Sequence, residues 1–296
     1  MASVWLSAVA DARWRSHAIG ETKMQLRPDD LWTRDPTRHP SFRVPEQSDV
    51  PLWRYMSGKR FRWLVEKQRL YMPRIAQLAG NDAREGTVTD WQSEFWKELI
   101  EKAETPQLKA RYKKDFERML RFVAMYRAGC FVSCWHQSPS ENFAFWRVYG
   151  REETACPSCE RVTVTSGESA AITTTFDKLE SLLPAHIEVG AVRYLDYQTE
   201  RVDLFNMFDY VMHKRHFYKY ESEVRAVASA ELGFDAARDH ILANQVEGSY
   251  APPVNVKAMV NEVVIHPEAK QSFREEIATI CEKHALPPPR LSGLAS

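Results

Sequence analysis

The sequence of 296 residues has no uninterrupted apolar run of the kind that spans a bilayer, which requires about 18 or more residues. Its opening, MASVWLSAVADARWR, lacks a basic segment, and charges interrupt its apolar part, so no signal peptide is expected. The 40 basic and 40 acidic side chains cancel, so no global field attracts nucleic acid or anionic membrane, although a local basic patch is compatible with this balance. We therefore expect a cytoplasmic protein that does not act at membranes.

Several common enzyme motifs are also missing. The sequence contains no G-x-x-x-x-G-K-[ST], G-x-G-x-x-G or G-x-S-x-G. The sequence therefore lacks the usual signatures of P-loop NTPases, Rossmann dinucleotide-binding proteins and α/β-hydrolases. The nine histidines form no H-E-x-x-H pattern, so a metalloprotease is not supported.

Cysteines are few, and their spacing argues against a zinc centre. The five cysteines are an odd number, and we expect reduced thiols. CPSC (156–159) has the spacing of a metal-binding hairpin, and Cys130 and Cys134 are the other pair to consider. If 130–136 is a strand, that second pair lies roughly 13 Å apart and cannot chelate one ion. We therefore predict no metal site and a reduced C-x-x-C in a surface turn.

The patterns that are present mix helices and strands without a regular βαβ alternation, which predicts an α+β fold. Residues 1–50 are rich in proline and charge and are expected to form an N-terminal arm. Residues 51–290 are expected to form a single domain with a helical insertion at about 90–128, broken at Pro106. Alternation and β-branched residues predict strands at 51–56, 130–136, 169–176, 187–197, 221–229 and the end of 256–267. Helical patterns are present after Ser57, within 138–150 with Ser140 as its cap, from 206 onward, and within 267–286.

The segment FYKYESEVRA (217–226) places Glu221, Glu223 and Arg225 at alternating positions of a β-prone run. On a strand these three side chains point to one side, and the residues between them point toward the core. Burying two carboxylates beside one arginine costs several kcal/mol unless the charges are paired and hydrogen-bonded, so a solvent-facing ion pair at a sheet edge is one interpretation. The alternative is the wall of a polar pocket, where neighbouring charges shift a carboxylate pKa and the carboxylate stabilises a cationic carbon.

A second candidate feature is aromatic. Trp146 and Tyr149 are three residues apart in a predicted helix and therefore share a face. Such a pair is either part of the core or a platform for a flat ring, such as a nicotinamide or a base.

Several segments taken together resemble one family. They are LWRYMS, RLYMPRIAQLAGNDAREG, FVSCWHQSPSENFAFWRVYG, AAITTTFDKL, IEVGAVRYLDY, HKRHFYKYESEVRAV and VNEVVIHPEAKQSF, in order over about residues 50–290. This succession resembles the bacterial domain-of-unknown-function family twenty-nine seventy-one. The family has no settled activity, and the resemblance implies a part in antiviral defence or toxin systems.

The layout of these blocks is also similar to the ADP-ribosyltransferase superfamily, whose late strand carries a catalytic Glu, often as E-x-E. This resemblance implies a central split or mixed sheet that cradles NAD as a substrate. It assigns catalysis to Glu223, with Glu221 as the other candidate. It assigns NAD contacts to Arg54, Tyr55, Trp146, Tyr149 and Arg225. The mapping requires 51–56 and 221–228 to be neighbouring strands.

The function expected from this resemblance is an ADP-ribosyltransferase-like or NAD-hydrolysing effector, acting on a nucleic-acid or protein acceptor or on water, with a partner protein of a defence system as a further expectation. Two alternatives stay open. One is a sensor module that binds a nucleotide or a phage component without catalysis. The other is a nuclease in which Glu221, Glu223, Asp82 and Glu85 surround a magnesium ion.

Overall fold

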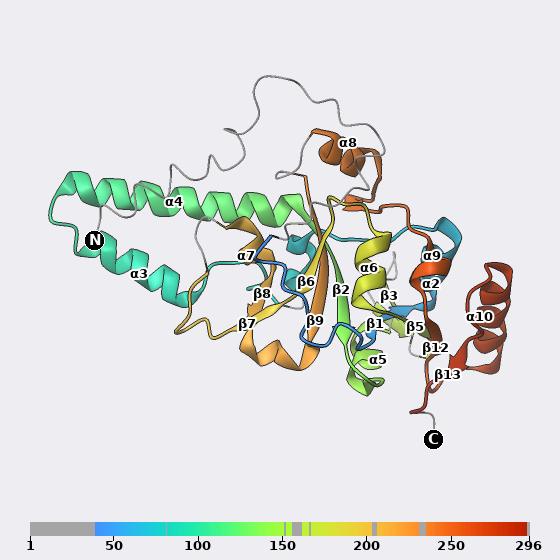
Figure 1. The fold of residues 1–296 in the computed structure, drawn as a ribbon. Helices are drawn as coiled ribbons and strands as arrows, with labels where there is room; N and C mark the ends of the chain where they lie inside the picture. Colours follow the sequence, from blue (N-terminus) through green and yellow to red (C-terminus); the bar gives the residue numbers. More distant parts are fainter. Residues whose placement is uncertain are drawn as a thin grey trace.

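The structure, a computed structural model, describes residues 39–80, 82–150, 152–155, 162–165, 167–202, 206–230 and 235–294. The CPSC segment and residues 1–38 of the expected arm lie outside these ranges. Strands and helices are mixed along the chain around one large, mostly antiparallel sheet (Figure 1). The predicted α+β class is therefore confirmed.

The main sheet has seven strands in the order β13-β12-β5-β1-β2-β9-β6. Their bounds are β1 (Leu52–Ser57), β2 (Cys130–Gln137), β5 (Ser169–Thr174), β6 (Glu188–Ala191), β9 (Glu223–Ser229), β12 (Glu262–Ile265) and β13 (Arg290–Leu291). Among the described strands of this sheet, β12 and β13 pair in parallel and the other neighbours pair antiparallel. β1 pairs with β2 at only two positions, whereas β2 pairs with β9 at seven. The sheet is thus well connected around β9 and weakly connected between β1 and β2.

Three two-stranded pairs lie beside the main sheet. They are β3 (Glu152–Ala155) with β4 (Val162–Thr165), β7 (Arg193–Leu195) with β8 (His213–Arg215), and β10 (Gln245–Val246) with β11 (Ser249–Tyr250). The β7–β8 pair is parallel and lies next to β9 in Figure 1. The pair therefore brings side chains of β7 and β8 close to the first residue of β9.

The predicted helices begin and end close to the expected residues. Ser57 caps α2 (Gly58–Lys67), and Pro106 separates α3 (Asp90–Glu101) from α4 (Pro106–Gly129), which project together from the sheet (Figure 1). α5 (Phe143–Tyr149) is capped by Asn142, so the prediction of Ser140 as the cap was wrong. The remaining helices are α6 (Phe176–Leu182), α7 (Met207–Val211), α8 (Asp235–Ala243), α9 (Val256–Met259), α10 (Gln271–Lys283), and the 3₁₀ helices η2 (Ile75–Gly80) and η3 (His216–Glu221).

Two sequence predictions of single elements were wrong for a common reason. The segment 187–197 contains two strands, because the chain leaves the main sheet at Val192 and pairs with β8. The segment 221–229 becomes a strand only at Glu223, because Ser222 has a left-handed φ of 39°. Both changes of direction depend on contacts with distant segments, and alternation within a short window does not reveal them.

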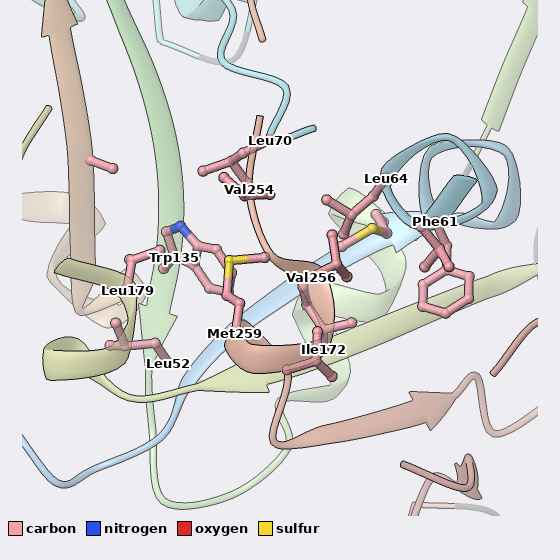
Figure 2. Packing of buried hydrophobic residues seen from close by; sticks show 14 of the residues in the cluster. Leu52, Phe61, Leu64, Leu70, Trp135, Ile172, Leu179, Val254, Val256 and Met259 are labelled. Atoms are coloured by element: carbon pink, nitrogen blue, oxygen red, sulfur yellow. The ribbon is translucent and has the colours of Figure 1, made fainter. Parts of the chain in front are cut away.

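The largest hydrophobic cluster lies on one face of the sheet. Leu52, Trp135 and Ile172 from the strands pack against Leu179 and Met259 from α6 and α9 (Figure 2). In β9, Val224 and Ala226 belong to this cluster, as the alternation predicted. The opposite face of the sheet therefore receives Glu223 and Arg225. In the described part of the chain, no helix has the length and apolar character of a membrane span.

Gly190 in β6 allows a close crossing of the chain over the sheet edge. A Cβ atom at this position would lie 2.6 Å from the Cα of Phe42. We predict that Gly190→Ala lowers the free energy of unfolding by about 1–3 kcal/mol, because backbone has to move. Denaturant unfolding checks this, with Gly293→Ala as the control, since its added Cβ would find its nearest neighbour at 3.7 Å. Equal stability of the two variants would contradict the prediction.

Candidate functional site

Arg225 is the centre of a buried network of charges on β9. Its side chain is fully buried, and its Nε and Nη2 atoms donate to the two carboxylate oxygens of Glu223 at 2.7 and 3.0 Å. Nη2 also donates to Glu85 Oε1 at 2.5 Å, and Nη1 donates to the carbonyl oxygen of Val211 at 2.6 Å. The guanidinium therefore ties β9 to the loop after η2 and to the end of α7.

Lys214 from β8 is the second cation of this network. Its Nζ lies 2.5 Å from Glu221 Oε2, 3.3 Å from Glu223 Oε2 and 3.5 Å from Glu85 Oε2. Three carboxylates thus share two cations, so full ionisation would leave one negative charge in excess. In a poorly hydrated site, such an excess favours protonation of one carboxylate.

The two carboxylates of the E-x-E pair differ in their pKa. Burial alone would raise the pKa of Glu223, but Arg225 and Lys214 outweigh it and lower the pKa to about 2. Burial raises the pKa of Glu221, and the negative charge of Glu223 adds to this effect, against the opposing influence of Lys214. The network therefore favours the ionised form of Glu223 and the protonated form of Glu221, each relative to an ordinary glutamate.

Two tyrosines and a histidine surround the carboxylates. Tyr149 donates its hydroxyl to Glu221 Oε1 at 3.4 Å, and the hydroxyl of Tyr194 accepts the backbone N–H of Glu223 at 2.7 Å. Burial raises the pKa of both phenols, so they remain neutral. The Nδ1 of His136 lies 2.5 Å from the carbonyl oxygen of Glu221 and fixes the last turn before β9. These groups hold the carboxylates in place without adding charge.

The structure brings together four of the seven residues predicted from the sequence: Glu221, Glu223, Arg225 and Tyr149. Lys214, His136 and Tyr194 were not predicted. Lys214 lies in the basic segment MHKRH, which on sequence alone is typical of a solvated face. Only the pairing of β7 with β8 places Lys214 beside the acidic pair, and no local pattern encodes that pairing.

Arg54 does not lie with the acidic pair. Alternation on β1 directs it to the face of the sheet that carries Trp135, whose ring centroid is 5.6 Å from the guanidinium carbon. Its Nη2 donates to the carbonyl oxygen of Tyr71 at 2.8 Å. In addition, β2 lies between β1 and β9. The expectation that 51–56 and 221–228 are neighbouring strands, with Arg54 facing Glu223 in one cleft, is therefore wrong.

Tyr55 and Trp146 form an aromatic cluster between β1 and α5. Their rings meet edge to face with centroids 4.9 Å apart, and Trp146 is only 1% exposed. The hydroxyl of Tyr55 accepts the backbone N–H of Asn142. Of the two interpretations of the aromatic pair, Trp146 fits the core, whereas Tyr149 extends from the same helix to Glu221.

The carboxylates named for a magnesium site are occupied by protein cations. Asp82 pairs with Arg215 at 2.7 Å, and Glu85, Glu221 and Glu223 surround the ammonium group of Lys214. Among the residues that the structure describes, no group of three or more His, Cys, Asp or Glu side chains is arranged to hold a metal ion. The magnesium-nuclease alternative therefore gains no geometric support.

No protein-family model, no curated protein and no solved structure matches the chain. The resemblance to family twenty-nine seventy-one and to ADP-ribosyltransferases thus stays a prediction from the sequence.

Removing Arg225 should unfold much of the site. We predict that Arg225→Met lowers the free energy of unfolding by about 3–5 kcal/mol, because Glu223 and Glu85 would keep buried charges without their partner. Arg62→Met is the matched control: the side chains of Arg62 and its partner Glu276 are 34% and 43% exposed, and the loss of this pair should cost about 1 kcal/mol or less. Chemical denaturation of both variants measures the difference, and similar losses would show that the buried network does not hold the fold.

Proposed function

We propose that the chain breaks the N-glycosidic bond of NAD, in an ADP-ribosyltransferase-like or NAD-hydrolysing reaction. The observation that carries this proposal is the Glu221–Glu223 pair, in which one ammonium group contacts both carboxylates and their pKa values are shifted in opposite directions. Pairs of carboxyl groups with separated pKa values are typical of acid/base chemistry at a glycosidic carbon.

The two carboxylates would have different roles. As the bond between the ribose carbon and nicotinamide breaks, nicotinamide leaves with the bonding electrons and the ribose becomes cationic. The ionised Glu223 stabilises that cation. Glu221 accepts the proton of the attacking acceptor hydroxyl or water, whose oxygen forms the new bond to the ribose carbon.

Glu221 and Lys214 are the least enclosed charged groups of the network. Their side chains are each 8% exposed, whereas Arg225 is completely enclosed. Substrate would therefore meet Glu221 first, with Tyr149 beside it. Arg54 and Trp146 lie elsewhere, so other residues would make the NAD contacts that the resemblance assigned to these two, whereas Tyr149 stays beside Glu221.

One observation favours a second candidate, a binding or sensor module without catalysis. Every carboxylate of the network already contacts Lys214, Arg225 or both. A network in which every carboxylate contacts a cation also occurs as a purely structural device that specifies a fold. The role in a defence or toxin system, with its partner protein, rests on the sequence resemblance alone.

Release of free nicotinamide from NAD tests the proposal. We predict release by the unchanged protein and a loss of about 100-fold or more in Glu223→Gln, because the charge that stabilises the cation is gone. Glu262→Gln, with an exposed carboxylate on β12, should release nicotinamide at the unchanged rate. No release by the unchanged protein, or equal rates in the two variants, would contradict the proposal and favour the binding module.

The pH dependence of release tests the role of Glu221. A base has to be deprotonated to accept a proton, so the rate should rise with pH through the pKa of Glu221, which lies above the ordinary value of a glutamate. Glu221→Gln should lower the rate and abolish this limb of the profile. An unchanged profile in a folded Glu221→Gln protein would remove Glu221 from the mechanism.

A further inference from the structure

The 3₁₀ helix η3 arranges the side chains of HFYKYE in three columns. In a 3₁₀ helix, residues i and i+3 eclipse each other. Tyr218 and Glu221 form the inner column: Lys214 Nζ lies 4.9 Å from the ring centroid of Tyr218 and 2.5 Å from Glu221. The other two columns consequently face away from the charge network.

The second column is aromatic and open to solvent. Phe217 is 69% exposed and Tyr220 is 61% exposed, more than any other large hydrophobic side chain in the described part of the chain. With a rise of about 2 Å per residue, their side chains follow each other about 6 Å apart along the axis. Two exposed rings in one column lose hydrophobic free energy in the free protein, which suggests that a ligand covers them.

The third column carries one positive charge, that of Lys219, beside the imidazole of His216. His216 and Lys219 are both exposed, and the imidazole of His216 lies against Phe217 with ring centroids 4.0 Å apart. On the inner side, Arg215 neutralises Asp82, and Glu221 is buried against Lys214. The outer surface of η3 thus presents rings and positive charge without an exposed acidic side chain of its own.

We propose that this surface, Phe217 and Tyr220 with His216 and Lys219, binds single-stranded nucleic acid. The rings provide stacking surfaces for unpaired bases, and the adjacent third column contacts the phosphates. Stacking of this type needs bases that are not paired, so a duplex fits poorly. An acidic protein segment would use Lys219 and His216 but would have no use for two rings in a column.

The position of this surface also indicates an acceptor for the proposed reaction. That assignment, unlike the binding itself, rests on the proposed function. Glu221 is the last residue of η3, so a strand held on the outer columns is bound to the same short helix as the residue that would accept a proton. A nucleic-acid group would then be the acceptor of ADP-ribose. The binding itself is independent of any reaction.

Fluorescence anisotropy with fluorescein-labelled single-stranded DNA and RNA of mixed sequence tests the binding. We expect both single strands to bind the full chain more tightly than the same sequence as a duplex. Phe217→Ala/Tyr220→Ala should weaken binding by about tenfold or more, because stacking is lost. Lys219→Ala should weaken binding and reduce its salt dependence.

Matched controls separate this surface from general surface effects. Leu242→Ala removes a 52% exposed apolar side chain from α8, and Lys102→Ala removes an exposed charge at the end of α3. Neither should change binding. Tighter binding of the duplex, equal binding of labelled polyglutamate, or an unaffected Phe217→Ala/Tyr220→Ala variant would overturn the inference.

The two proposals can fail separately. Nicotinamide release without binding of single strands would leave the NAD reaction and remove the nucleic-acid surface. Binding that depends on Phe217 and Tyr220, without nicotinamide release, would leave the surface and remove the reaction.

Discussion

The buried charge of Arg225 has to be satisfied by groups from several parts of the chain. A fully buried guanidinium is costly unless its donors and its charge are satisfied, and here Glu223, Glu85 and the carbonyl oxygen of Val211 do so. These partners come from three separate segments of the chain. The requirement to satisfy Arg225 therefore fixes the loop after η2 and the end of α7 against β9, and with them the position of Lys214.

The excess of one carboxylate over the two cations gives the network its chemical character. If cations and carboxylates were equal in number, each charge could have its own partner. Here, however, Glu85, Glu221 and Glu223 share Lys214. Glu223 lies between both cations, which lower its pKa against the effect of burial, whereas Glu221 contacts only one of the two cations, Lys214, and burial raises its pKa. Its place at the end of η3 puts the residue that we propose as the base on the same short helix as the exposed rings of Phe217 and Tyr220.

Local patterns in the sequence were enough to predict much of the fold and part of the site. Capping by Ser57, the break at Pro106 and the alternation of β9 each depend on neighbouring residues, and each prediction was confirmed. Local patterns were not enough to predict the site. Whether Arg54 faces Glu223 depends on strand order, and β2 lies between the two strands. Lys214 is buried by the pairing of β7 with β8, which joins segments about 20 residues apart that no window of alternating residues relates.

Titration of the individual glutamates tests the central claim most directly, because the account depends on Glu221 and Glu223 having separated pKa values. The side-chain carboxyl carbons of the full chain, labelled with ¹³C-glutamate, can be followed by NMR as a function of pH and assigned with Glu221→Gln and Glu223→Gln. The account predicts that Glu223 stays ionised down to a pH of about 2 and that Glu221 titrates above the ordinary glutamate value. If both carboxyl groups titrated together near the ordinary value, the two residues would not differ in role and the account would be contradicted.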